Sequence, residues 1–344
     1  MSRQLIEEIL DTNKRQSEKF VQTTNDRRAY RAQHPTEFLF TLCMDGRINI
    51  YALTGLMFGL FNLLRNIGGA YRIGWDLFQA TLEQWEEWCY GMRRYATVIT
   101  TYHWSAADRQ AGCAGHGYDQ LKSIIETQQL RDDISRCYGG RILAIMMGIE
   151  TESEAIILHG ERGLTIDMRE YAHDASEEKL RILLTATLPN LPDQVREDLI
   201  PILMGNARHV MELRSSPRHA NQRLHCERVL AIGTGFDWLD KLNFALIIGP
   251  CDPDRRRAVE KAAGIIWSNW ESGRVPGDKD GVLLISVACR NRGKMAAAAQ
   301  RALETARNAV EILDSIPHMR GLLHPLVGVT DMEKREFRVL DFPH

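Results

Sequence analysis

The sequence predicts an α/β protein whose mostly parallel sheet is flanked by helices, with this fold repeated inside the chain. Three observations lead to this prediction. Short apolar runs typical of β-strands alternate with amphipathic segments, which indicates parallel strands joined by helices. The same order of elements returns in the second half of the chain. The length of 344 residues is enough for two domains of about 150 residues each.

The first segment, residues 1–33, has apolar side chains at helical spacing and ends at His34-Pro35, because the residue before a proline disfavours the helical conformation. We interpret residues 1–36 as a helical arm that docks elsewhere. A helix of the main core fits the same pattern equally well.

The next elements, from residue 37 to about 190, form the first α/β domain. Its predicted strands are 36–42, 95–102 and 141–148, and its predicted helices are 48–64, 76–94 and 118–136. The most apolar stretch, residues 48–64, is shorter than the roughly 20 residues of a membrane helix and contains two asparagines. We therefore interpret it as a buried helix.

Three prolines, at 189, 192 and 201, place a domain boundary near residue 190, so that residues 191–344 form the second domain. Its predicted strands are 228–232, 245–248 and 281–288, its predicted helices are 255–272 and 295–313, and residues 326–340 form the last apolar run.

Three pairs of segments correspond between the two halves, in the same order and at offsets of 180 to 190 residues. The pairs are Phe38–Leu42 with Arg228–Ile232, Val98–Tyr102 with Leu284–Ala288, and Met147–Thr151 with Val327–Asp331. This order favours an internal duplication over a chance match. The alignment places Gly233 at the position of Cys43, Gly235 at that of Asp45, and Cys289 near that of His103.

The composition excludes several classes of protein. A net charge of −2 argues against a general nucleic-acid binder, and 44% apolar with 26% charged residues is typical of a globular enzyme. The N-terminus lacks the apolar core of a secretory signal, so we expect a cytoplasmic protein without a membrane partner. In a reducing compartment, the seven cysteines are better interpreted as core residues, catalytic groups or metal ligands than as disulfides.

Three residues suited to binding metal follow the ends of predicted strands. Cys43 and His103 come directly after two of these strands, and Cys113 lies in the next loop. Ligands and catalytic groups collect at the carboxyl edge of parallel sheets. Two thiolates and an imidazole suit zinc, and three protein ligands leave the fourth position open, as in catalytic sites. The alternative, that these cysteines are buried small apolar residues, stays open on spacing alone.

Three further residues lie close to these candidates in the sequence. Arg47 has the spacing to hold Asp45 through a bidentate ion pair, and Asp45 is placed to accept the proton of a hydroxide on zinc. His116 is a candidate proton shuttle between zinc-bound water and buffer. A loop histidine bonded to the backbone is an equal alternative for His116.

Three motifs carry a resemblance to a known family. They are Cys43-Met44-Asp45-Gly46-Arg47, Tyr102-His103-Trp104-Ser105 and Gly112-Cys113-Ala114-Gly115-His116-Gly117. Together they resemble the carboxysome shell carbonic anhydrases, a divergent branch of the β-class enzymes. Gly46 stands where ordinary β-class enzymes have serine, and nine residues separate His103 from Cys113, as in the shell branch. Gly148–Glu152 and Glu227–Asp237 extend the likeness.

The resemblance implies a duplicated β-carbonic-anhydrase-like fold whose second copy is degenerate and binds no metal. One zinc ion per chain would be held by Cys43, His103 and Cys113. Asp45 and Arg47 would orient zinc-bound hydroxide in the reversible hydration of CO2 to bicarbonate. The chain would form a homodimer or a higher homo-oligomer. Arg65, in a stretch similar to the Arg-Asn-Ala-Gly of ordinary β-class enzymes, becomes a candidate for the rim of the site.

Two other functions are kept as alternatives. Hydrolysis of CS2 or COS would use similar chemistry on the same fold, and a non-catalytic assembly protein would keep zinc for structure. Shell enzymes of this family carry a long N-terminal region associated with Rubisco and shell packaging, whereas 42 residues precede Cys43 here. We therefore expect a cytoplasmic location, with the carboxysome, and Rubisco or shell partners, as the alternative.

Overall fold

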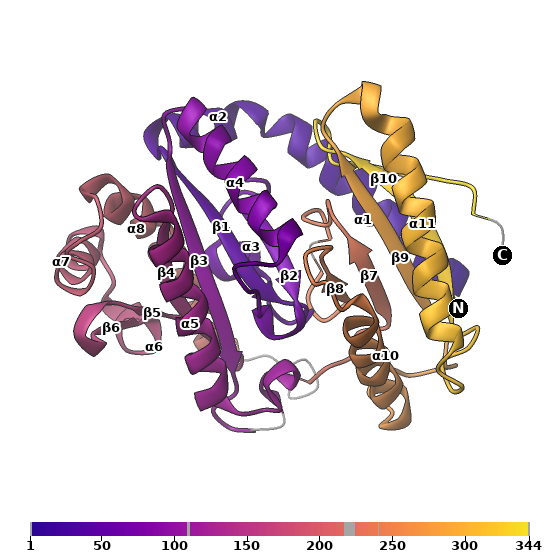
Figure 1. Ribbon diagram of the computed structural model, residues 1–344. Coiled ribbons are helices and arrows are strands. Elements are labelled where there is room, and N and C mark those ends of the chain that lie inside the picture. Colours follow the sequence, from indigo (N-terminus) through magenta and orange to yellow (C-terminus); the bar gives the residue numbers. More distant parts are fainter. Residues whose placement is uncertain (1, 109–110, 217–223, 240, 343–344) are drawn as a thin grey trace. The chain divides into compact units, whose positions relative to one another are not determined.

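The computed structural model describes residues 2–108, 111–216, 224–239 and 241–342, and it has an α/β architecture with two sheets (Figure 1). This architecture confirms the predicted fold class. The chain divides into two compact units. The first unit comprises the described residues of 25–43 and 48–223, and the second comprises those of 1–24, 44–47 and 224–344. Within the described ranges, no helix has both the length and the apolar character needed to cross a membrane.

The first unit is built on a six-stranded sheet of order β2-β1-β3-β4-β5-β6. The strands are β1 (Thr36–Cys43), β2 (Asn62–Asn66), β3 (Tyr95–Trp104), β4 (Leu143–Glu150), β5 (Ala155–His159) and β6 (Thr165–Asp167). Strands β1 to β4 run parallel, and β5 and β6 are antiparallel to their neighbours. All residues of β1 are buried, as expected for a parallel strand that is covered on both faces.

The described part of this unit contains seven α-helices. They are α2 (Thr24–Gln33), whose first residue belongs to the second unit, α3 (Ile50–Thr54), α4 (Asp76–Gly91), α5 (Gln120–Tyr138), α6 (Met168–Tyr171), α7 (Glu177–Thr187) and α8 (Asp193–Ser215). Helices α4 and α5 pack against β3, and α5 also packs against β4 (Figure 1). The carboxyl ends of β1 and β3 are each followed by a loop.

The second unit has a five-stranded sheet of order β11-β10-β9-β7-β8. Its elements are α1 (Ser2–Gln22), β7 (Val229–Gly233), β8 (Ala245–Ile248), α10 (Arg255–Glu271), β9 (Gly281–Cys289), α11 (Met295–Asp314), β10 (Leu323–Asp331) and β11 (Glu336–Val339). Helix α11 packs against β9 and β10, and α10 packs against β7 and β8 (Figure 1).

The N-terminal segment contains two helices, α1 and α2, where the sequence pattern predicts one. Helix α1 buries Leu5 and Ile9 and packs against β9 and β11. The side-chain amide of Asn13 donates to the Arg335 carbonyl, and its oxygen accepts from the Phe337 amide, both at 2.8 Å. These contacts make α1 part of the core of the second unit, which was the alternative to a docking arm.

The two sheets have the same topology, which is compatible with the predicted duplication. The order β2-β1-β3-β4-β5 in one unit matches β8-β7-β9-β10-β11 in the other, and the last pair is antiparallel in both. Cys43 ends β1 as Gly233 ends β7, in agreement with the alignment. The strand register corrects this alignment at the position of His103. His103 pairs with Ile149 in the first sheet, and Val287 pairs with Val329 at the equivalent place in the second. Val287, rather than Cys289, is therefore the equivalent of His103.

The prediction of a helix over residues 48–64 is wrong. Only Ile50–Thr54 is helical, and Asn62–Asn66 forms strand β2, which pairs in parallel with β1. Gly55 ends the helix in the left-handed conformation, with φ of 61°. A continuous apolar run does not distinguish a buried helix from a buried strand, and here it contains one short element of each type.

The first compact unit extends past the predicted boundary near residue 190 and includes helix α8. The buried Asn206 side chain of α8 donates to the carbonyls of Leu53 and Glu154, at 3.0 and 2.9 Å. It also accepts from the Ile156 amide at 2.8 Å. The Asn206 side chain thus provides hydrogen-bond partners for three backbone groups. These bonds attach α8 to the first unit by polar as well as apolar contacts.

We predict opposite effects for the same substitution at two helical glycines. A Cβ at Gly205 in α8 would lie 1.6 Å from the Thr54 carbonyl oxygen, whereas at the exposed Gly264 in α10 nothing lies within 4 Å. Gly205→Ala should destabilise the protein by at least about 1–3 kcal/mol through overpacking. Gly264→Ala should stabilise it by about 0.5–1 kcal/mol through helix propensity. Urea unfolding measures both, and midpoints that shift in the same direction would contradict the prediction.

Candidate metal centre

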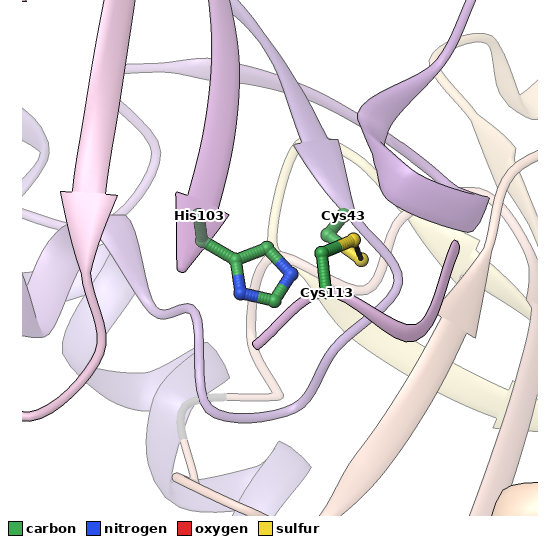
Figure 2. A group of neighbouring side chains, drawn as sticks. All are labelled: Cys43, His103 and Cys113. Carbon is green, nitrogen blue, oxygen red and sulfur yellow. Dashed lines mark hydrogen bonds between the residues drawn. The ribbon is translucent and has the colours of Figure 1, made fainter. Parts of the chain in front are cut away.

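Two parallel strands bring two of the predicted metal ligands to the same edge of the first sheet. Cys43 is the last residue of β1, and His103 is the next-to-last residue of β3. These strands are paired in parallel, so their carboxyl ends meet at one edge. Cys113 comes from the following loop, directly before the short 3₁₀ helix η3 (Ala114–His116). Figure 2 shows the three side chains converging on one point.

The three side chains have the geometry of a metal site. All are buried, and their ligand atoms lie within 4.8 Å of one another. The Sγ atoms of Cys43 and Cys113 are 3.8 Å apart and form no disulfide. Two sulfurs bound to one tetrahedral zinc ion at about 2.3 Å would be about 3.8 Å apart. The donor set and the sulfur–sulfur distance therefore both fit zinc.

The two thiols influence each other. The hydrogen bond to Cys113 and burial raise the pKa of Cys43 well above its ordinary value, and His103 lowers it by a smaller amount. Zinc binds the deprotonated form of cysteine, so metal binding at such a site must displace protons. Zinc binding here would therefore release the thiol protons.

Arg65 binds the backbone at both ends of the segment 44–47, at Cys43 and at Ile48. Its guanidinium donates to the Cys43 carbonyl at 3.0 Å and to the Ile48 carbonyl at 2.5 Å. Arg65 lies on β2, which pairs with β1 up to Cys43 opposite Asn66. The sequence suggested Arg65 for the rim of the site, and the structure shows it binding the backbone of a predicted ligand.

Two glycines allow the Cys113 loop to approach the loop after β2. A Cβ at Gly115 would lie 2.6 Å from the Gly68 amide nitrogen, and Gly68 itself has φ of 66°. Residues with side chains would push these loops apart at the first position and be strained at the second. The close approach therefore helps to hold Cys113 in place.

His116 forms a hydrogen bond with Gly68, one of these two glycines. Its Nε2 lies 3.0 Å from the Gly68 carbonyl oxygen, and its Nδ1 lies 3.4 Å from a Glu126 carboxylate oxygen. A carbonyl only accepts, so Nε2 carries a proton and donates it to Gly68. Burial lowers the pKa of His116. These contacts are those of a loop histidine bonded to the backbone, the alternative to a proton shuttle.

Asp45 and Arg47 form a buried ion pair inside the second unit. Arg47 donates through Nε to Oδ1 of Asp45 at 3.0 Å and through Nη2 to Oδ2 at 2.6 Å. The Arg47 amide adds a third bond to Oδ1 at 2.9 Å. Such a bidentate pair fixes the orientation of the carboxylate.

His225 contacts this pair and Glu227 contacts His225, and the sequence pattern does not reveal this connection. His225 Nε2 lies 3.0 Å from Arg47 Nη2, and His225 Nδ1 lies 3.0 Å from the Glu227 carboxylate. In the sequence, Glu227 stands out only as part of the family resemblance, and His225 does not stand out. They lie about 180 residues after Arg47, and for His225 the only available signal was its position just before the predicted strand at 228–232.

The second sheet lacks ligand atoms at the positions equivalent to Cys43 and Asp45. Gly233 and Gly235 occupy these positions and have no side chain to bind a metal. At Gly233 a Cβ would lie 1.9 Å from the Ser286 carbonyl oxygen. The end of β7 therefore has no room for a cysteine.

Comparison with known proteins agrees with this geometry. Residues 81–181 match the family of the carboxysome shell carbonic anhydrase, catalytic domain. The matched range contains His103 and Cys113, and Cys43 and Asp45 lie before it. The match confirms the predicted resemblance to this family. A comparison with curated proteins found no match.

We predict that the wild-type protein binds one zinc ion per chain and that Cys43→Ser removes most of it. A neutral serine hydroxyl replaces the thiolate, and only two of the three predicted ligands remain. Zinc content after dialysis, measured by mass spectrometry, checks this. Cys137→Ser, which changes an exposed thiol on α5, should keep full zinc content. Retention of zinc by Cys43→Ser would contradict the assignment.

We also predict that Arg65→Ala weakens zinc binding by about 10–100-fold without removing a ligand. The substitution frees the carbonyl of Cys43 from its brace, and loss of such supporting contacts commonly costs this much affinity. Competition with a fluorescent chelator measures the change. Arg136→Ala, which changes an exposed arginine on α5, is the matched control. Equal affinities for the two variants would argue against a bracing role.

Proposed function

We propose that the protein is a zinc-dependent carbonic anhydrase that catalyses the reversible hydration of CO2 to bicarbonate. The observation that carries the proposal is the buried group of Cys43, His103 and Cys113 at the carboxyl edge of a parallel sheet. A set of three protein ligands is typical of a catalytic zinc site, because it leaves the fourth position open. The family match over residues 81–181 supports the same reaction.

The chemistry expected from the metal is simple. When bound, zinc would supply a water of lowered pKa, roughly 7, a value for which carbonic anhydrase itself is the standard example. The two thiols and the imidazole would hold the ion. Because all three side chains are buried, little water would compete with them for the metal.

We propose that Asp45 accepts a hydrogen bond from the reacting hydroxyl group and that Arg47 holds Asp45 for this role. Asp45 follows Cys43 by two residues, so covalent connection keeps their Cα atoms within about 7 Å of each other. The bidentate pair with Arg47 keeps the carboxylate in one orientation. An ionised carboxylate only accepts, which would select the lone pairs of the hydroxyl for attack on CO2.

Three other expectations remain predictions. A shuttle role for His116 would require its Nε2 proton to leave the Gly68 carbonyl during turnover. The homodimer follows from the family resemblance, and the expected location stays the cytoplasm, with the carboxysome as the alternative.

We predict that the zinc-loaded protein hydrates CO2 and that Asp45→Asn lowers kcat/KM by at least about 10²-fold. The asparagine amide would offer a donor where the carboxylate accepts, and would lose the charge that pairs with Arg47. Stopped-flow measurement of proton release checks this. Asp278→Asn, at an exposed position of the same unit, should leave the rate unchanged.

The same sample should be tested with COS and CS2, since these substrates distinguish the alternative hydrolase. Faster turnover of either compound than of CO2 would replace the proposed substrate. Full zinc content without activity toward any of the three compounds would favour the non-catalytic assembly protein.

A further inference from the structure

The second unit contains a buried polar network that the proposed reaction does not fully use. It joins Asp45 and Arg47 to His225 and Glu227, all of which are buried, and Glu227 is 0% exposed. Burial of so many polar and charged groups is costly unless each is paired. The network therefore has to be understood as one connected set of hydrogen bonds.

The direction of the hydrogen bonds follows from Arg47. A guanidinium has only donors, and Nη2 of Arg47 lies 3.0 Å from Nε2 of His225. Oδ2 of Asp45 is farther from Nε2, at 3.5 Å. Because the closer neighbour of Nε2 is a donor, Nε2 accepts from Arg47, which places the imidazole proton on Nδ1. Nδ1 lies 3.0 Å from both carboxylate oxygens of Glu227 and donates to them. These two contacts favour the Nδ1–H tautomer of His225.

Glu227 also binds the backbone of the segment that contains the ion pair. Its Oε1 accepts from the Gly46 amide at 3.0 Å. Asn269 donates to the Glu227 carbonyl at 2.9 Å, which holds the residue itself in place. Glu227 is thus connected to the Asp45–Arg47 pair by two routes, one through the Gly46 backbone and one through His225.

The same contact explains why position 46 is glycine. A Cβ there would lie 2.7 Å from the Ala245 carbonyl oxygen and 2.9 Å from Cγ of Glu227. Glu227 and strand β8 occupy the space that a serine would need. The position of the Glu227 side chain therefore depends on a glycine at position 46.

A second cation site is the competing interpretation of this cluster. Asp45, His225 and Glu227 offer three ligand atoms within 4.8 Å of one another. However, the Arg47 guanidinium is bonded to Asp45 and faces His225 Nε2, so it already supplies the positive charge that a metal ion would bring. The observations favour a hydrogen-bond network over a metal.

We infer that Glu227 is a positioning residue that fixes His225 as an acceptor for Arg47 and thereby holds the Asp45–Arg47 pair for reaction. The catalytic consequence rests on the proposed function, because it assumes that this pair acts on the hydroxyl group. The hydrogen-bond arrangement itself does not depend on that assumption.

The experiment compares the wild-type protein with Glu227→Gln, which keeps the shape of the side chain and removes its charge. Nitrogen-15 NMR of labelled histidine reads the tautomer directly, and the loss of one signal pair in His225→Gln assigns it. We expect a protonated Nδ1 in the wild type and a partial shift to the Nε2–H form in Glu227→Gln. We also expect kcat to fall by about 10–100-fold, with KM nearly unchanged and zinc content equal to that of the wild type.

Asp331→Asn is the matched control, since it alters another buried carboxylate in the same unit, at the end of β10. It should leave the His225 tautomer and kcat unchanged. If Glu227→Gln fails to fold, the tautomer of the wild type still decides the question.

Three results would overturn the inference. These are an Nε2–H form of His225 in the wild type, an unchanged tautomer and kcat in Glu227→Gln, and a second metal ion per chain that Glu227→Gln loses. A wild-type protein with the expected tautomer but without CO2 hydration would instead reject the proposed function and leave the network in place.

Discussion

The parallel pairing of β1 with β3 is the interaction on which the metal centre depends. The register places Thr41 opposite Thr100, so Cys43 and His103 both follow within three residues at the carboxyl ends of neighbouring strands. A shift of this register by one residue would turn one of the two side chains to the other face of the sheet. Both strands are buried along almost their whole length, and their register sets the distance between the first two predicted ligands.

The third ligand depends on a contact between loops. Cys113 has no strand to fix it, and the glycine pair of Gly68 and Gly115 lets its loop lie directly against the loop after β2. The hydrogen bond from His116 to Gly68 closes this contact. A pair of strands and a pair of glycines thus build a site from segments that are up to 70 residues apart in the sequence.

Local patterns predicted the central strands of both sheets, the helices α4, α5, α10 and α11, and the three ligand candidates, because each depends on periodicity or on position at the end of a strand. The short strands β2, β5 and β6 and the helices α6 to α8 were not predicted. Residues 48–64 were predicted wrongly, since an apolar run has no period that would separate a short helix from a strand. The residues of α8 were placed in the second domain because prolines mark breaks in the chain but do not show where the next segment packs. The bonds of Asn206 to Leu53 and Glu154 decide that question, and they connect distant residues. The contact of His225 with Arg47 escaped prediction for the same reason.

The two sheets share a topology but differ at the ends of β1 and β7. The end of β7 has lost the ligand position, since Gly233 lies too close to Ser286 for any side chain, so a second metal centre of the same kind has no place there. Meanwhile, the segment 44–47 of the first copy belongs to the second unit, where Met44 and Gly46 accept bonds from the amides of Ile247 and Asn243. The residues just before β7 and on β8 bind this segment, so the Asp45–Arg47 pair is fixed by contacts inside the second unit.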